Sequence, residues 1–171
     1  MKFILLRPAT MADSGFLLRV RNDYETRSMS RNMDVIGEAD HIKWFTTTTD
    51  LVYIAETMGE RIGYIRFIQH PHETELSFAI APEHRGKQYA ASMLTAALKL
   101  PWSIQKPLVA YVREENRKSW RAFLRADWKH AGEYHRYEAP QQDGGGTESV
   151  VGGSPSDSER PGSPVEWPGA Y

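Results

Sequence analysis

The chain has 171 residues, a formal net charge of −1 and a pI near 6.6. This length suits one domain with a substantial core, and the near-neutral charge gives no electrostatic reason to expect a nucleic-acid or bulk membrane binder. No cysteine is present, which excludes disulfides, thiolate metal sites and a cysteine nucleophile. The four apolar residues before Arg7 and Pro8 are too few for a signal peptide or a membrane span. We therefore expect a cytoplasmic protein without a metal site.

The N-terminal part predicts a strand followed by a helix. Residues 2–7 are mostly apolar, and Pro8 ends the strand. Thr10 and Asp13 resemble the N-terminal cap of a helix whose apolar face includes Phe16, Leu17 and Val20.

The next stretch, residues 21–32, is polar and rich in arginine. It is typical of a solvated loop, and the dense arginines also fit a loop that faces a substrate. Residues 38–47 predict a short helix packed through Ile42, Trp44 and Phe45. His41 lies on this helix and, taken alone, is an ordinary surface or capped histidine.

Residues 51–56 and 61–68 predict two strands joined by the turn Met58-Gly59-Glu60, which is a hairpin signature. A further strand over residues 75–80 alternates polar and apolar side chains, and Pro82 ends it because proline has no amide hydrogen for the ladder.

A basic turn follows this strand and leads into a helix with an apolar stripe that begins at Tyr89. The first amides of a helix lack intrahelical acceptors, and with the helix dipole they attract phosphate. Gly86 lets the backbone approach a bulky ligand, and Arg85 and Lys87 add positive charge. The strand, turn and helix together predict an anion site.

The remaining elements are a buried strand over residues 107–112, a helix over 116–125 and one or two closing strands over 128–139. We expect a mixed α/β sheet of six to seven strands with four helices on its faces. Residues 1–140 would form the domain. Of the last 31 residues, 16 are Gly, Pro or Ser, so we expect residues 141–171 to be a disordered tail.

The motifs R-G-K-Q-Y-A at residues 85–90 and E-N-R-K-S at 115–119, in this order of elements, resemble the GNAT family of acetyl-CoA-dependent N-acetyltransferases. The resemblance covers residues 2–139 and implies an acyl-CoA N-acyltransferase fold with acetyl-CoA as cosubstrate and no metal. It places the pantetheine arm and the thioester carbonyl against the backbone of Phe78, Ala79 and Ile80. The other coenzyme-contacting positions that it implies are Arg85, Gly86, Lys87, Gln88, Tyr89, Ala90, Asn116, Ser119 and Phe123.

Three positions depart from the family pattern. Gln88 replaces the inner glycine of the coenzyme turn; we expect it to sit in the first helical turn, where no positive φ is needed. Phe123 replaces a tyrosine that can protonate the departing thiolate, which would slow the reaction without forbidding it. Asp127 replaces a common glycine and is tolerable because Asp adopts the left-handed region more readily than most residues.

A narrower resemblance lies near the N-terminus. The pattern R-N-D-x-x-T-R-x-x-S followed by E-A-D-H-I-K-W-F is similar to GNAT acetyltransferases that act on nucleotide-linked 4-amino sugars in flagellin and surface-glycan pathways. This resemblance favours a substrate-site role for His41. Ser30 matches the pattern as well, and the acceptor-binding positions that the resemblance implies are Arg21, Asn22, Arg27, His41 and Trp44.

In the mechanism that the family implies, the amine attacks the thioester directly and Glu75 is the general base, either directly or through water. The alternative for Glu75 is an exposed strand glutamate. The leading hypothesis is therefore an N-acetyltransferase with acetyl-CoA and a nucleotide-linked amino sugar as partners, and a homodimer is compatible with it. Two other hypotheses stay open: an acetyltransferase of protein N-termini, as for ribosomal proteins, and a non-catalytic coenzyme A-binding module.

Overall fold

The computed structural model describes residues 2–30, 32–48, 50–100, 106–131 and 136–140. The tail expected over residues 141–171 lies outside the described residues. Within the described ranges, no helix is long and apolar enough to cross a membrane.

A single seven-stranded mixed sheet forms the centre of the fold, in the order β1-β2-β3-β4-β5-β7-β6. All neighbouring strands pair antiparallel except β4 and β5, which are parallel. This confirms the expected α/β sheet. The strands are β1 (Leu5–Pro8), β2 (Leu51–Thr57), β3 (Glu60–Gln69), β4 (Thr74–Ile80), β5 (Leu108–Tyr111), β6 (Lys129–Ala131) and β7 (Arg136–Glu138).

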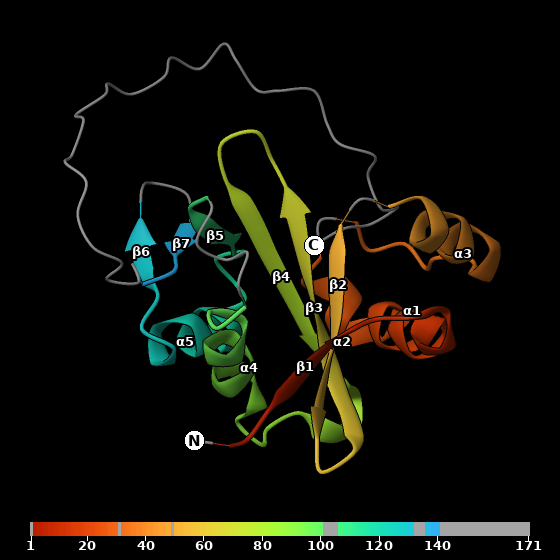
Figure 1. The fold of residues 1–171 in the computed structure, drawn as a ribbon, viewed down its shortest axis with the longest axis horizontal. Helices are drawn as coiled ribbons and strands as arrows, with labels where there is room; N and C mark the ends of the chain where they lie inside the picture. The colour runs from red at the N-terminus through yellow and green to blue at the C-terminus, as the bar shows by residue number, and fades with distance from the viewer. Residues whose placement is uncertain (1, 31, 49, 101–105, 132–135, 141–171) are drawn as a thin grey trace.

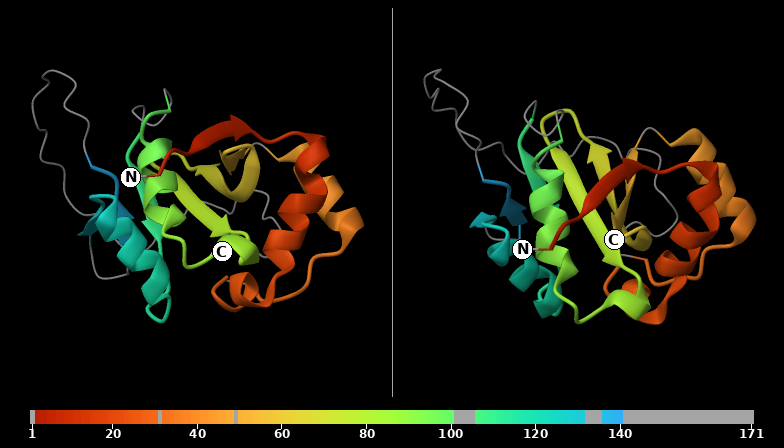
Figure 2. Two further views of the ribbon diagram at one scale, coloured as in Figure 1. Left: turned by 90° about the horizontal axis from the view of Figure 1, so that it is seen from below. Right: turned by 60° about the horizontal axis from the view of Figure 1, so that its bottom comes forward.

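Helices cover both faces of the sheet (Figures 1 and 2). On one face lie α4 (Tyr89–Ala97) and α5 (Arg117–Arg125), which bury Met93, Leu94 and Phe123 in the larger core. On the other lie α1 (Ser14–Asn22) and α3 (Glu38–Thr47), which bury Leu17 and Trp44 in a second core. The sheet therefore separates two apolar cores.

The expectation of a loop over residues 21–32 is wrong in part. The helix α1 continues to Asn22, and a short helix α2 (Tyr24–Ser28) follows it. Asp23 caps α2 by accepting a hydrogen bond from the backbone amide of Thr26 at 3.2 Å. The polar composition of this stretch did not indicate α2, because the helix depends on this cap and on tertiary contacts.

Local turn chemistry behaves as expected elsewhere. Met58 and Gly59, between β2 and β3, have φ of 49° and 80°, as a two-residue hairpin turn requires. Near the N-terminus, the Thr10 amide donates to the Asp13 carboxylate at 2.9 Å before a 3₁₀ turn, η1 (Met11–Asp13). The Arg7 guanidinium also donates to Asp13, and this contact holds the pKa of the Asp13 carboxyl well below its ordinary value.

The feature that positions the site is the short pairing between β4 and β5. Their register contains only Thr74 with Leu108 and Glu75 with Val109. From that point β4 continues to Ile80 alongside β3, whereas β5 ends at Tyr111. A gap in the sheet therefore opens beside the second half of β4.

Gly63 on β3 is packed against the end of β4. A Cβ at this position would lie 2.2 Å from the carbonyl oxygen of Ala79, which is backbone and cannot rotate away. The close approach of β3 to this part of β4 thus requires glycine.

We expect Gly63→Ala to destabilise the protein by about 1 to 3 kcal/mol, because the added methyl forces the strands apart. Thermal unfolding should show a melting temperature lower by roughly 3 to 9 °C. Gly15→Ala is the matched control: its Cβ meets nothing within 4 Å, and alanine favours the helix. Equal effects of the two substitutions would contradict this explanation.

Candidate active site

A cavity of about 700 Å³ occupies the gap between β4 and β5. Its wall combines residues of β3, β4 and β5, the turn before α4, helices α4 and α5, and residues of α1 and α2. The expected site residues that line it are Arg21, Phe78, Ala79, Ile80, Arg85, Gly86, Gln88, Tyr89, Ala90, Asn116, Ser119 and Phe123. Ser30 lines it as well. Among the described residues, those expected in the site that lie outside this lining are Asn22, Arg27, His41, Trp44, Glu75 and Lys87.

The second half of β4 directs backbone amides into the cavity. The Thr74 amide donates to the carbonyl of Pro107, which directly precedes β5. The Ala81 amide donates in the opposite direction, to the carbonyl of Ile62 on β3. Backbone direction alternates along a strand, so the amides of Phe78 and Ile80 point to the side that β5 has left. They can therefore donate to carbonyl oxygens of a bound ligand, including those of its amide groups.

The turn before α4 contains two left-handed residues. Gly86 has φ of 73°, and Gln88, the N-cap residue of α4, has φ of 62° and ψ of 27°. The expectation that Gln88 needs no positive φ is therefore wrong: α4 begins at Tyr89, one residue later than that assumption required. Because a Cβ is disfavoured in this region, the left-handed conformation of Gln88 has a cost in strain.

Asn116 caps α5 and also lines the cavity. Its side-chain oxygen accepts a hydrogen bond from the Ser119 amide at 3.1 Å. One turn further on, Phe123 is buried against Phe78 and Trp128, with ring centroids 5.6 and 4.9 Å away. Phe123 thus contributes an apolar wall where the family commonly has a phenol.

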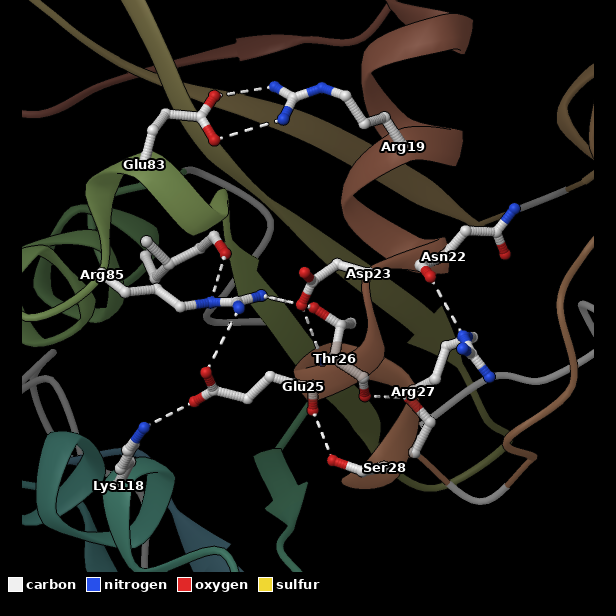
Figure 3. Close-up of polar contacts among 12 residues, drawn as sticks. Arg19, Asn22, Asp23, Glu25, Thr26, Arg27, Ser28, Glu83, Arg85 and Lys118 are labelled. Atoms are coloured by element: carbon white, nitrogen blue, oxygen red, sulfur yellow. Dashed lines mark hydrogen bonds and ion pairs between the residues drawn. The ribbon is translucent and has the colours of Figure 1, made fainter.

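Arg85 links the turn before α4 to helix α2 (Figure 3). Its Nη2 donates to the carboxylate of Asp23 at 2.6 Å and to the hydroxyl of Thr26 at 2.9 Å. Its Nε donates to the carbonyl of Ile80 at 3.2 Å. The side chain therefore fastens α2 onto the end of β4, a role that the local sequence did not indicate.

Glu25 joins the two sides of the cavity in the same network (Figure 3). Its carboxylate lies 3.3 Å from Nη1 of Arg85 and 2.6 Å from Nζ of Lys118 on α5. All three residues line the cavity. Neither Glu25 nor Lys118 was expected in the site, although Lys118 lies inside the motif of α5.

Three polar residues of the arginine-rich stretch before α3, all expected in the acceptor site, have different roles: Arg21 lines the cavity, whereas Asn22 and Arg27 make internal contacts. Arg21 is 2% exposed, lines the cavity and donates to the Asn32 carbonyl at 2.9 Å; burial lowers its pKa. Arg27 instead donates to the carbonyls of Asn22 and Met33. The Asn22 side chain bonds both backbone groups of Ile36. Asn22 and Arg27 thus hold the segment between α2 and α3.

His41 and Trp44 lie outside the cavity lining, although the Arg66 guanidinium, which lines the cavity, lies 5.3 Å from the Trp44 ring centroid. His41 is fully buried, with its ring stacked on Phe45 at 6.0 Å and tilted against Trp44 at 5.7 Å. Burial lowers the pKa of His41, which favours the neutral imidazole. The interpretation of His41 as a surface histidine is therefore wrong.

Four polar residues that sequence reasoning missed form the floor of the cavity on the α1 face of the sheet: Tyr64, Arg66, Ser77 and Tyr111. Arg66 is buried and pairs with Asp50 at 2.6 Å, and burial raises the pKa of Tyr64 to about 12. An arginine inside the apolar run of β3 was the available signal, because a buried charge needs a specific partner.

Glu75 lies just behind this floor. Ser77 is two residues along β4, on the same face of the sheet, and lines the cavity. The Glu75 residue is 2% exposed, so the interpretation of an exposed strand glutamate is wrong. Its Oε2 lies 3.2 Å from Nε2 of His70.

The left-handed conformation of Gln88 gives a stability test. We expect Gln88→Gly to be about 1 kcal/mol more stable than Gln88→Ala, because alanine keeps the strain that glycine removes. Lys87, which has no positive φ, is the control, and there glycine should be the less stable variant. Denaturant unfolding of the four variants measures both differences; the same order at both positions would refute the assignment.

The chain was compared with known proteins. The family model described as an acetyltransferase (GNAT) domain matches residues 4–129. No curated protein sequence matches the chain significantly.

Solved structures show the same fold. One is an aminoglycoside acetyltransferase in complex with coenzyme A, 17% identical, with a TM-score of 0.66 over 76% of this chain and 86% of that one. Another is a spermidine N-acetyltransferase from Vibrio cholerae with coenzyme A and spermine, 19% identical, with a TM-score of 0.65 over 79% and 91%. A third is a GNAT-family acetyltransferase from Bacillus anthracis, 18% identical, with a TM-score of 0.65 over 79% and 92%.

The family match spans most of the chain and includes β1 to β5, residues 85–90 and 115–119, and the residues that line the cavity. The chain therefore belongs to the GNAT family of acetyltransferases, and its cosubstrate is acetyl-CoA.

Proposed function

We propose that this protein transfers the acetyl group of acetyl-CoA to the amine of a nucleotide-linked amino sugar, by direct attack in a ternary complex. The observation that carries the proposal is the cavity at the β4–β5 gap, which has a coenzyme motif on each side and backbone amides along one wall.

The coenzyme would enter between α4 and α5. The turn at Gly86 and Gln88 and the first amides of α4 would hold the pyrophosphate. The amides of Phe78 and Ile80 would hold the pantetheine arm and the thioester oxygen. Such preorganised donors stabilise the oxyanion that forms when the amine attacks, and this is often the largest contribution to catalysis.

The charge of the cavity favours an anionic acceptor. Its described lining contains seven arginine or lysine residues and one acidic residue, Glu25, while two carboxylates outside the lining, Asp23 and Asp50, pair with Arg85 and Arg66. The phosphates of coenzyme A would compensate part of this charge. Arg21 and Arg66 line the part of the cavity next to α1 and β3, where an acceptor phosphate would be attracted. A polyamine acceptor such as spermine would be repelled by the same residues.

Glu75 is the proposed general base, and its place behind Ser77 favours action through a water molecule. The proton would pass from the attacking amine to that water and from the water to the carboxylate. The acetyl carbon would then release the thiolate of coenzyme A. Position 123 is a phenylalanine, which has no hydroxyl group. Another hydroxyl or a water would therefore protonate the thiolate.

The acceptor class can be tested by measuring thiol release from acetyl-CoA. We expect turnover with UDP- or dTDP-linked amino sugars and at least tenfold lower kcat/KM with the corresponding free amino sugars, because these lack the phosphates. N-terminal peptides and spermine are the comparison acceptors. Preferred turnover of peptides would favour an N-terminal acetyltransferase, and coenzyme binding without turnover of any amine would favour a non-catalytic module.

The role of Glu75 gives a second prediction. Glu75→Gln keeps the size of the side chain but cannot accept a proton, so we expect kcat to fall about 10²- to 10⁴-fold with little change in the KM for acetyl-CoA. The pH–rate profile of the residual activity should also change. Unchanged turnover and an unchanged profile would remove Glu75 from the mechanism.

A further inference from the structure

His70 is a residue next to the site that the coenzyme and acceptor assignments do not use. It lies between β3 and β4, and its Nε2 is 3.2 Å from Oε2 of Glu75. The His70 side chain is 25% exposed, whereas that of Glu75 is 3% exposed. The imidazole therefore touches the enclosed carboxylate and solvent at the same time.

Two backbone contacts hold His70 in this position. Its amide donates to the Glu73 carbonyl at 2.9 Å, which closes the turn before β4. Its carbonyl accepts a hydrogen bond from Nζ of Lys106 at 2.8 Å. The backbone of this turn is thus fixed at both polar groups, and the ring is presented to Glu75 from a defined position.

Neighbouring charged groups have partners of their own. Glu73 pairs with Arg136 at 3.0 Å and accepts a hydrogen bond from the Tyr111 hydroxyl at 2.7 Å. On the cavity side, Arg66 pairs with Asp50. Lys106 donates to the backbone carbonyl of His70 and not to either side chain of the pair. The contact between His70 and Glu75 thus joins an imidazole and a carboxylate, which can both accept and release a proton.

Transfer to an amine releases one proton in each catalytic cycle, and a buried base must lose that proton before the next cycle. We propose that His70 is a positioning and proton-relay residue that carries protons from Glu75 to solvent; this rests on the proposed function of Glu75 as general base. The neutral Glu75 carboxyl gives its proton to Nε2 of His70. The imidazole then releases the proton on Nδ1 to water, which restores the carboxylate and leaves a neutral ring protonated on Nε2. Rotation of the partly exposed ring and proton exchange with water return it to the Nδ1–H tautomer before the next cycle.

The test combines three variants with chemical rescue. His70→Ala opens a space beside Glu75, and we expect kcat to fall about 10- to 100-fold while the KM for acetyl-CoA stays unchanged. Added imidazole should restore kcat in a saturable way. His70→Gln can still hydrogen-bond to Glu75 but cannot relay a proton, so its kcat should fall similarly and should not respond to imidazole.

His72→Ala is the matched control, because this exposed histidine lies two residues away on the same turn. We expect it to keep wild-type kcat with or without imidazole. Wild-type kcat in His70→Gln, or failure of imidazole to rescue His70→Ala while acetyl-CoA binding is retained, would overturn the relay. An inactive wild-type enzyme, or full activity of Glu75→Gln, would instead refute the proposed function itself.

Discussion

The site depends on the early separation of two parallel strands. A continuous ladder between β4 and β5 would consume the amides of Phe78 and Ile80, and no cavity could form between α4 and α5. The pairing instead stops after Glu75, and β4 continues with β3 as its support on the other side. The close contact at Gly63 keeps that support tight. The second half of β4 thus has one edge that is paired with β3 and one edge that is available to a ligand.

The same region connects the turn before α4 with helix α2. Arg85 belongs to the turn before α4, yet its guanidinium is engaged by Asp23 and Thr26 of α2 and by the end of β4. Glu25 extends this network to Lys118 on α5. The helix α2 also contributes Thr26 to the cavity wall. The turn that would hold phosphate and the helix beside the acceptor are therefore one connected structure.

Much of the fold could be predicted from local patterns. The strands could be predicted from the alternation of polar and apolar residues, the prolines and the turn at Gly59. The helices α3, α4 and α5 could be predicted from their apolar stripes. The turn that we expect to bind an anion also lies between a strand and a helix start, as its sequence indicated. These features depend on neighbours within a few residues, which a single sequence contains.

The features that could not be predicted depend on contacts between distant segments. Nothing in the local sequence pairs Arg85 with α2 or places His70 against Glu75. The burial of His41 depends on how α3 packs on the sheet, and the left-handed Gln88 on where α4 begins. The side chains of Asn22 and Arg27, both expected in the acceptor site, satisfy the backbone groups of Ile36 and the carbonyls of Asn22 and Met33.

The central claim is that acetyl-CoA binds in the gap between β4 and β5. Titration of ¹⁵N-labelled protein with acetyl-CoA, followed by amide chemical shifts, tests this most directly. The account predicts the largest shifts at Phe78, Ile80, residues 86–90 and the start of α5. Saturable binding with its largest shifts on the face of α3, or no binding at all, would contradict it.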